Sequence, residues 1–438
     1  MDNTLKSSLL NFYRRWGGGI PLSLVLFSIL LQIQVSLFAH DEYKGVRINL
    51  ADIILPFYMS WAVFSVIIKK SKYPILALRY WEGWLLLLLF VMTVALFRGY
   101  AILGYFSIWA LINKYVGLVI LVSYFVLGAW FMANVKKKDE ALNLLSYSFV
   151  CFFVLILFLS VVCFLIQPFL SFSLFLPVFP WEFFMGNRNA LMVLSVYVLC
   201  IMIVHDVKAE CFFSQWVKAA FWSMLPIFWV YNASRTGWVV MGVLFLFFIF
   251  LNFKNFLKNV LPFLVLGMVL AYGMTQSFYV KNIANGQSLD MLIRAVDSSQ
   301  ELGVNDKIRK ISLEDGWDLY AQSNPFLGAG LGVYKPFQIE KRGKFIEIID
   351  FTGLWLLTEV GLLGLCLFGG FFFAVFLVLV RRYQEDKSAF LGAIALFLFC
   401  FAGISLLHEV MYTRFVWFVV GIALTMGGQY FCWARKMV

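Results

Sequence analysis

Two arginines of this chain lie where a positive charge is costly unless it binds something. Arg188 and Arg235 both fall near the outer ends of long apolar segments. A charge at membrane depth is usually functional or paired, and the guanidinium group matches phosphate oxygens in a bidentate geometry. We therefore predict that Arg235 binds an anionic group, with an interhelical ion pair as the alternative. For Arg188 the alternative is a side chain that snorkels to the interface.

The long polar segment 276–352 and its border supply further candidates. Arg309 is flanked by Lys307 and Lys310, which predicts either a second phosphate clamp or a solvated helix face. Asp350 precedes an apolar segment, where partial burial raises the pKa of a carboxyl towards a value useful for a base. The alternative for Asp350 is a helix N-cap, because Asp is favoured there.

Three more residues lie beyond this segment. Glu359 is predicted to be a structural partner, for example of an arginine. His408 and Arg414 occupy a short outer connection that also contains Glu409. A lone histidine at an interface is either structural or a remote base, and interfacial arginines are common. We include His408 and Arg414 among the predicted binding residues.

Three alternating glycines follow Pro325, at Gly328, Gly330 and Gly332. Glycine permits left-handed turns and a close approach of backbone to another group. A loop that binds a phosphate is one interpretation, although the Lys-Ser/Thr of a P-loop is absent. A tight turn leading back to the membrane is the other.

Composition indicates the class of protein. Of 438 residues, 62% are hydrophobic and 13% are charged, and the mean hydropathy is +0.87. The apolar residues form blocks of about 16–25, the length of a membrane-spanning helix, and strand alternation is absent. The net charge of +11 fits Lys and Arg in inside loops rather than nucleic-acid binding. Cysteine and histidine spacing predicts neither a disulfide framework nor a metal site, and no cofactor is expected.

The hydropathy pattern predicts an all-α polytopic membrane protein with about twelve transmembrane helices and both termini inside. Residues 1–438 form one membrane domain, and 276–352 form a large outer loop between the ninth and tenth spans. The aromatic run from Phe175 to Phe184 is predicted to line a groove for an apolar chain, which the family resemblance given below would make a polyprenyl groove, or else to be an interfacial aromatic belt. The predicted spans are 20–38, 50–68, 84–97, 115–133, 141–166, 189–204, 219–231, 237–251, 260–275, 353–380, 388–407 and 415–432.

The outer loop also contains a predicted helix. An amphipathic pattern places apolar residues among polar ones. These apolar residues are Ile308, Ile311, Leu313, Trp317 and Leu319.

Five motifs, in order and on consistent sides of the membrane, resemble the O-antigen polymerase and O-antigen ligase superfamily over nearly the full length. The Ser-Arg-Thr-Gly stretch corresponds to the family's Ser-Arg signature, and Arg309 and Trp317 with the glycine run correspond to its loop motif. The motifs are Ile48–Pro56, Gly186–Asn189, Ser234–Gly237, Arg309 to Gly332 and Thr358–Gly364.

The resemblance implies a C-type glycosyltransferase architecture in a bacterial inner membrane, with the active site facing the periplasm. It implies an undecaprenyl-diphosphate-linked sugar donor and no required metal. The expected partners are this lipid-linked glycan, membrane lipid and a chain-length regulator protein. Catalysis is assigned to Asp350 and Arg235, and binding of diphosphate and glycan to Arg188, Arg235, Arg309, the three glycines, His408 and Arg414.

The branch of the superfamily depends on one histidine. In the family's ligases this histidine is followed by one polar residue (Asn, Ser or Gln) and then by nine residues. The first glycine of the last motif comes next. Counting back from Gly361 puts Asp350 and Phe351 there, which favours a polymerase and leaves a ligase as the alternative. A lipid-linked glycan transporter or flippase is disfavoured, because the polar residues concentrate around one loop rather than in broken helices of two halves.

Overall fold

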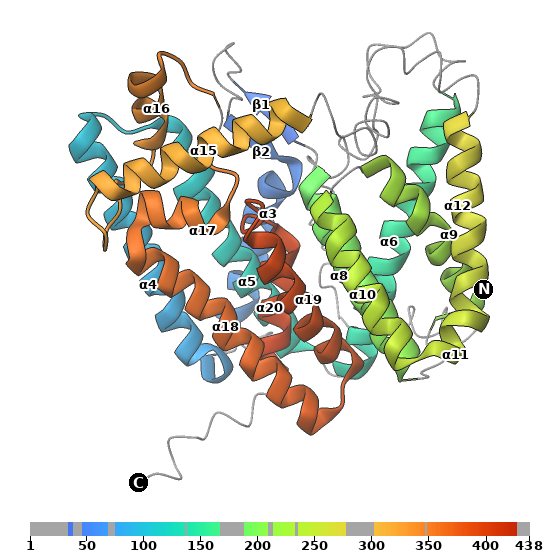
Figure 1. Ribbon diagram of the computed structural model, residues 1–438. Helices are drawn as coiled ribbons and strands as arrows, with labels where there is room; N and C mark the ends of the chain where they lie inside the picture. The colour runs from blue at the N-terminus through green and yellow to red at the C-terminus, as the bar shows by residue number, and fades with distance from the viewer. Residues whose placement is uncertain are drawn as a thin grey trace.

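A computed structural model describes residues 34–37, 46–68, 75–135, 138–166, 188–208, 213–232, 235–276, 302–346 and 348–426. Within these ranges the chain is a bundle of helices with a small two-stranded sheet (Figure 1). The bundle helices are α3 (Leu50–Ile67), α4 (Ile75–Leu103), α5 (Gly117–Asn134), α6 (Lys138–Ile166), α8 (Arg188–Val207), α9 (Gln215–Asn232), α10 (Arg235–Leu251), α11 (Phe253–Asn255), α12 (Leu261–Gln276), α17 (Thr352–Trp355), α18 (Gly361–Asp386), α19 (Ala389–Ser405) and α20 (Arg414–Thr425). Three π-helical turns continue into neighbouring helices: η1 (Ala110–Val116), η2 (Phe256–Val260) and η3 (Leu356–Val360).

Each predicted span from the second onward coincides with a helix over the residues that the structure describes. Six helices in this part of the chain are long and apolar enough to cross a membrane, and four more apolar helices are shorter. Several expose large apolar side chains outwards, such as Phe250, which is 88% exposed, as lipid-facing helices do. The protein is therefore a helical membrane protein, while the number twelve and the sidedness of the long loop stay predictions. The six helices are 80–103, 110–134, 138–159, 189–207, 253–273 and 352–386.

The first predicted span is wrong at its end. Residues Gln34–Leu37 form strand β1, which pairs antiparallel with β2 (Val46–Asn49). Both strands alternate polar with apolar residues and contain β-branched valine or isoleucine, a pattern that favours a strand over a helix. The small sheet leads directly into α3, and residues 20–33 lie outside the described part of the chain.

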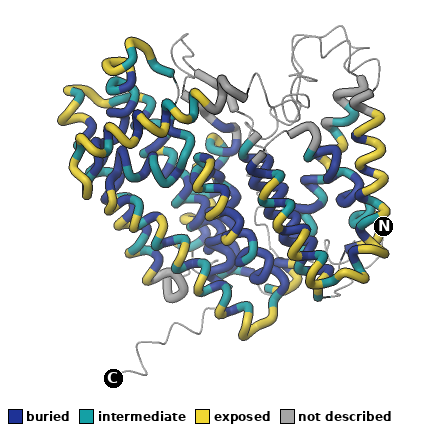
Figure 2. Tube along the Cα trace, viewed as in Figure 1, coloured by how far each residue is buried: buried dark blue, intermediate teal, exposed yellow. Residues whose placement is uncertain are grey.

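The interior of the bundle is apolar and closely packed. Residues 191–203 of α8 have almost no solvent contact, and Figure 2 shows buried positions gathered along the central helices. Helices α5 and α20 approach each other closely: a Cβ on Gly128 would lie 2.1 Å from the carbonyl oxygen of Phe418, and one on Gly421 would lie 2.1 Å from that of Phe125. Small residues allow such contact between membrane helices. These contacts hold the middle of α20 against α5.

Two further helices lie across one end of the bundle, the upper end in Figure 1. They are α15 (Leu302–Gln322) and α16 (Tyr334–Arg342). We call the described residues of this region, 302–346 and 348–351, the cap. The helix predicted from the amphipathic pattern is confirmed, but its buried face differs from the apolar residues of that pattern. Leu313 and Trp317 are 45% and 56% exposed, whereas Ser312 and Asp315 are buried.

Candidate active site

Arg188 and Arg235 are the first residues of α8 and α10. Both helices therefore begin where the sequence predicts an anion-binding arginine. Their side chains lie outside what the structure describes, so their proposed roles stay predictions. The aromatic run at 175–184 also lies outside the described residues.

Arg309 and Asp350, which are 41 positions apart in sequence, lie together in the structure. Arg309 Nε is 3.8 Å from Asp350 Oδ2, and the two side chains are 42% and 33% exposed. The pair joins α15 to the residues just before α17, and both side chains can be reached from water. The N-cap alternative for Asp350 is wrong, because Phe351 occupies the N-cap position of α17.

His408 lies in the connection between α19 and α20 and is only 5% exposed. Its Nε2 is 3.0 Å from Oγ1 of Thr236, the residue that follows Arg235 at the start of α10. The Thr352 hydroxyl donates a hydrogen bond of 2.8 Å to the His408 carbonyl. These contacts bring the start of α10, the start of α17 and the 406–413 connection together.

The electrostatic environment keeps the His408 ring neutral. Burial, and then the positive charge of Arg309, lower the pKa of His408 from 6.5 to about 4. A neutral imidazole has one nitrogen that accepts a hydrogen bond or a proton. Arg309 is therefore close enough for its charge to act on the His408 ring.

The glycine-rich turn packs against protein on two sides. Gly328, Gly330 and Gly332 have φ values of +65°, +100° and +85°. Ala329 and Gly330 donate their N–H groups to the carbonyls of Thr358 and Glu359, at 2.7 and 3.0 Å. These bonds favour the tight-turn interpretation over a phosphate-binding loop; a ligand-binding role of the three glycines stays a prediction.

The same turn also contacts α4. The Leu331 amide donates to the Ala95 carbonyl at 2.9 Å, and Arg98 Nε donates to the Gly328 carbonyl at 2.7 Å. A Cβ on Gly330 would lie 2.4 Å from the Gly99 nitrogen. Only glycine fits a left-handed residue at this distance from another backbone.

Arg414 forms an ion pair with Asp52, a partner that the sequence analysis did not identify. Its guanidinium binds both carboxylate oxygens of Asp52, with Nε to Oδ1 at 2.6 Å, and the two side chains are 14% and 9% exposed. The side-chain oxygen of Asn49, in its corrected amide orientation, accepts from the same guanidinium. Asp52 and Asn49 belong to the 48–56 motif. The sequence shows this motif but does not show that it contacts Arg414. The arrangement fixes the start of α3 to the start of α20; binding of substrate by Arg414 stays a prediction.

A second cluster that sequence reasoning missed lies around Lys114. This side chain is 3% exposed and forms an ion pair with Glu409, and its Nζ lies 4.2 Å from the centre of the Trp355 ring. Lys114 adjoins the predicted fourth span, so hydropathy alone presents it as an ordinary flanking lysine. The ion pair with Lys114 fixes the position of Glu409, the residue that follows His408.

Glu359 is structural, as predicted, although its described partners are not arginines. Its two carboxylate oxygens accept from the Gly332 amide at 3.1 Å and from Trp355 Nε1 at 2.8 Å. It also interacts electrostatically with Lys114. Glu359 therefore connects the glycine-rich turn to the Lys114 cluster.

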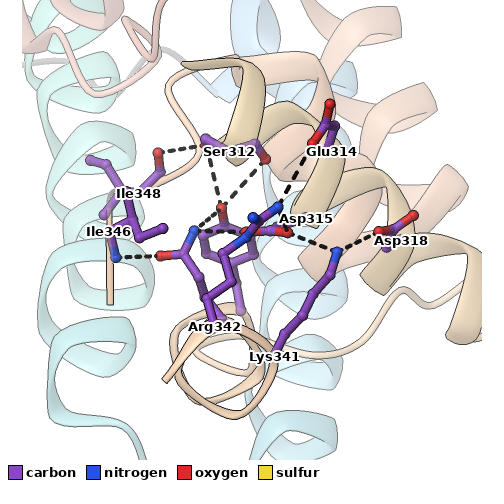
Figure 3. A network of polar contacts seen from close by, with 10 residues as sticks. Ser312, Glu314, Asp315, Asp318, Lys341, Arg342, Ile346 and Ile348 are labelled. Carbon is purple, nitrogen blue, oxygen red and sulfur yellow. Dashed lines mark hydrogen bonds and ion pairs between the residues drawn. The ribbon is translucent and has the colours of Figure 1, made fainter. Parts of the chain in front are cut away.

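The cap is held together by a polar network around Asp315 (Figure 3). This carboxylate is fully buried and accepts two hydrogen bonds from Arg342, at 2.7 and 2.8 Å, and one from Lys341 at 2.8 Å. Gln338 donates to Asp315 at 3.1 Å and accepts from the Ile346 amide at 2.7 Å. The network joins α15, α16 and the segment that leads to Asp350, and so fixes the backbone that carries the Arg309–Asp350 pair.

The pKa values in this network follow from its hydrogen bonds. Burial alone would raise the pKa of Asp315, but the bonds from Arg342, Lys341 and Gln338 outweigh it and lower the pKa. Hydrogen bonds to Asp315 in turn raise the pKa of Lys341 and of Arg342. All three groups stay charged at neutral pH, and the pairs stabilise the cap there.

The described residues include no group of three or more His, Cys, Asp or Glu side chains that could hold a metal ion. What they bring together is an accessible guanidinium and carboxylate, a nearly buried neutral imidazole and the first turn of α10. Such a set can hold an anionic group beside a proton acceptor.

Comparison with known proteins bears on this region directly. Residues 219–369 match a family model described as O-antigen ligase, whereas no curated protein matches the chain. The matched residues run from α9 into α18 and include Arg235, Arg309 and Asp350; His408 lies beyond them. The match supports membership of this membrane protein in the superfamily of O-antigen polymerases and O-antigen ligases, glycosyltransferase-like proteins of lipopolysaccharide biosynthesis.

Proposed function

We propose that the protein is an O-antigen polymerase. It joins undecaprenyl-diphosphate-linked oligosaccharide repeat units at the periplasmic face of the bacterial inner membrane. The observation that carries this proposal is the Arg309–Asp350 pair at 3.8 Å, together with the contact of His408 with Thr236 in the first turn of α10. Most of these residues lie within the stretch that matches the O-antigen ligase family.

The site has the chemistry that transfer from a lipid diphosphate requires. The leaving diphosphate develops negative charge, and a preorganised arginine stabilises that charge most strongly where water is scarce. Arg309 is accessible, and Arg235 begins a helix next to Thr236, which contacts His408. Two groups can accept the proton of the acceptor hydroxyl, namely the Asp350 carboxylate, as the sequence predicts, and the neutral His408 ring.

A ligase that transfers glycan to lipid A–core is the second candidate. The description of the matching family favours it. The absence of histidine at the position occupied by Asp350 and Phe351 favours the polymerase. A lipid-linked glycan transporter is a third and weaker candidate.

The lipopolysaccharide of a deletion strain separates the first two candidates. A polymerase deletion leaves core that carries a single repeat unit, because ligation still works. A ligase deletion leaves bare core, while long polymer accumulates on the carrier lipid. Unchanged long-chain lipopolysaccharide would contradict both.

The role of the site is tested by substituting Arg309. Arg309→Ala, expressed in the deletion strain, is expected to lower formation of long glycan by about 100-fold, as the loss of one charge-stabilising group does in other enzymes. Lys310→Ala is the matched control, because Lys310 is 76% exposed and its pairing with Glu314 lies on the same helix. Equal ladders from both variants, at equal protein levels, would remove Arg309 from the site.

A further inference from the structure

His408 contacts Thr236 at the start of α10, is bonded through its carbonyl to Thr352 at the start of α17, and has its pKa lowered by the charge of Arg309. The ring is held from Nε2 by Thr236, at 3.0 Å. Among the described residues no hydrogen bond engages Nδ1. A ring that donates from Nε2 to the Thr236 oxygen carries its lone pair on Nδ1. In that tautomer, Nδ1 is the nitrogen able to accept a proton.

We propose that His408 is the general base that takes the proton from the acceptor sugar hydroxyl, and that Asp350 orients Arg309 instead. The inference rests on the proposed function, because it assigns a step within glycan transfer. It gives a catalytic role to a residue outside the stretch that matches the family.

The proposed step conserves atoms and charge. The O–H bond of the acceptor sugar breaks and its proton moves to His408 Nδ1. The freed oxygen forms a bond to the anomeric carbon of the donor sugar, while the bond from that carbon to the diphosphate oxygen breaks. The electron pair stays on undecaprenyl diphosphate, whose charge is neutralised by the arginines. His408 then releases its proton to solvent.

Geometry favours His408 over Asp350 as the base. The Asp350 carboxylate faces the guanidinium of Arg309 at 3.8 Å, so this carboxylate is placed to orient Arg309. The His408 ring is almost dry, so a hydroxyl that reaches it has left water behind. The Thr236 contact and the Thr352 bond to the His408 backbone fix the position of the ring, as proton transfer requires.

Arg309 connects the base to the donor. After burial, the charge of Arg309 is the second cause of the low pKa of His408. When a diphosphate binds Arg309, the anion offsets that charge, and His408 becomes a stronger base. Donor binding therefore relieves the part of the lowering that Arg309 causes, while burial continues to lower the pKa of His408.

The experiment compares variants of the full-length protein in the deletion strain and in purified membranes supplied with lipid-linked repeat units. His408→Gln retains an amide that can bond to Thr236 but cannot take up a proton, so transfer is expected to fall at least about 100-fold. Asp350→Asn is expected to fall about 10-fold or less. Thr236→Val is expected to lower transfer, whereas Thr236→Ser keeps the hydroxyl and most of the activity.

Imidazole rescue separates a base from a structural histidine. In His408→Ala, added imidazole is expected to restore transfer in proportion to its neutral form as pH is varied. The inference is overturned if His408→Gln stays within threefold of the wild-type rate, or if His408→Ala gains nothing from imidazole. If Arg309→Ala still abolishes transfer in that case, the proposed function stands without this base.

Discussion

The glycine-rich turn at 328–332 and the site around His408 both adjoin α17 and η3, yet they differ in how completely their polar groups are used. In the turn, the amides from Gly328 to Gly332 all donate to protein oxygens. At the site, the described contact of Arg309 is an ion pair at 3.8 Å, and His408 has one described hydrogen bond to its ring. The turn has little capacity left for a ligand, whereas the site has an accessible charged pair.

This difference distinguishes groups that hold the fold from groups that can bind. Buried polar groups of a structural region are normally satisfied within the protein, as Asp315 and the Arg414–Asp52 pair also are. A charged group left partly exposed, beside a partner beyond hydrogen-bond distance, can exchange that partner for a ligand at small cost. By this criterion Arg309 is a ligand-binding group, whereas Gly330 and Asp315 are structural groups that hold the fold; we call these structural groups the frame.

The largest expected effect is on the frame. Gly330→Ala would place a Cβ 2.4 Å from the Gly99 nitrogen at a φ of +100°, so both backbone strain and a clash oppose folding. We expect a loss of about 4 kcal/mol in the free energy of unfolding, measured by denaturation of the purified protein in detergent. The matched control is Gly343→Ala, which has a φ of +76° but no neighbour within 4 Å and should cost about 1 kcal/mol. Equal losses would mean that the turn is not closely packed against α4.

A somewhat smaller effect is expected in the cap. Asp315→Asn removes the charge that Arg342 and Lys341 share, and we expect a loss of about 3 kcal/mol in stability. Asp318→Asn is the matched control, because Asp318 also contacts Lys341 but is 52% exposed, and an exposed pair contributes less than about 1 kcal/mol. Limited proteolysis of the cap, with glycan transfer measured on the same samples, checks both. Normal stability in Asp315→Asn would contradict a structural role of the network.

The sequence predicts the helices well and the partners poorly. Long apolar blocks predict α3 to α12 and α17 to α20 because hydropathy depends on neighbouring residues, and the amphipathic pattern predicts α15. The sequence does not predict strand β1, because its apolar residues directly follow the preceding apolar block and fall in the same predicted span. The sequence does not predict the buried face of α15, because Asp315 and Ser312 on that face are polar and are stabilised there by hydrogen bonds.

The site is predictable only in its components. Arg309 and Asp350 are both recognisable as candidates, but their proximity depends on how the cap folds back onto the bundle. His408 is a weak candidate in sequence because a lone interfacial histidine has no spacing to interpret. Its importance comes from Thr236 in α10 and from Arg309 in α15, which are more than ninety residues away along the chain. The pairs Arg414–Asp52 and Lys114–Glu409 are likewise set by helix packing alone.

The smallest effect, and the one that most directly tests the site, is a pH dependence of stability. The pKa of His408 in the folded protein, about 4, is below its ordinary value of 6.5, so the unfolded state binds a proton more readily than the folded state. Stability is therefore fully present above pH 6.5 and is lost as pH falls towards 4. Between pH 7 and pH 5 the loss should be about 2 kcal/mol, whereas Asp315, with a pKa lowered from 3.8, contributes only below this window. Unfolding measured across the window should lose this slope in His408→Gln; an unchanged slope would show that the ring is not held neutral beside Arg309.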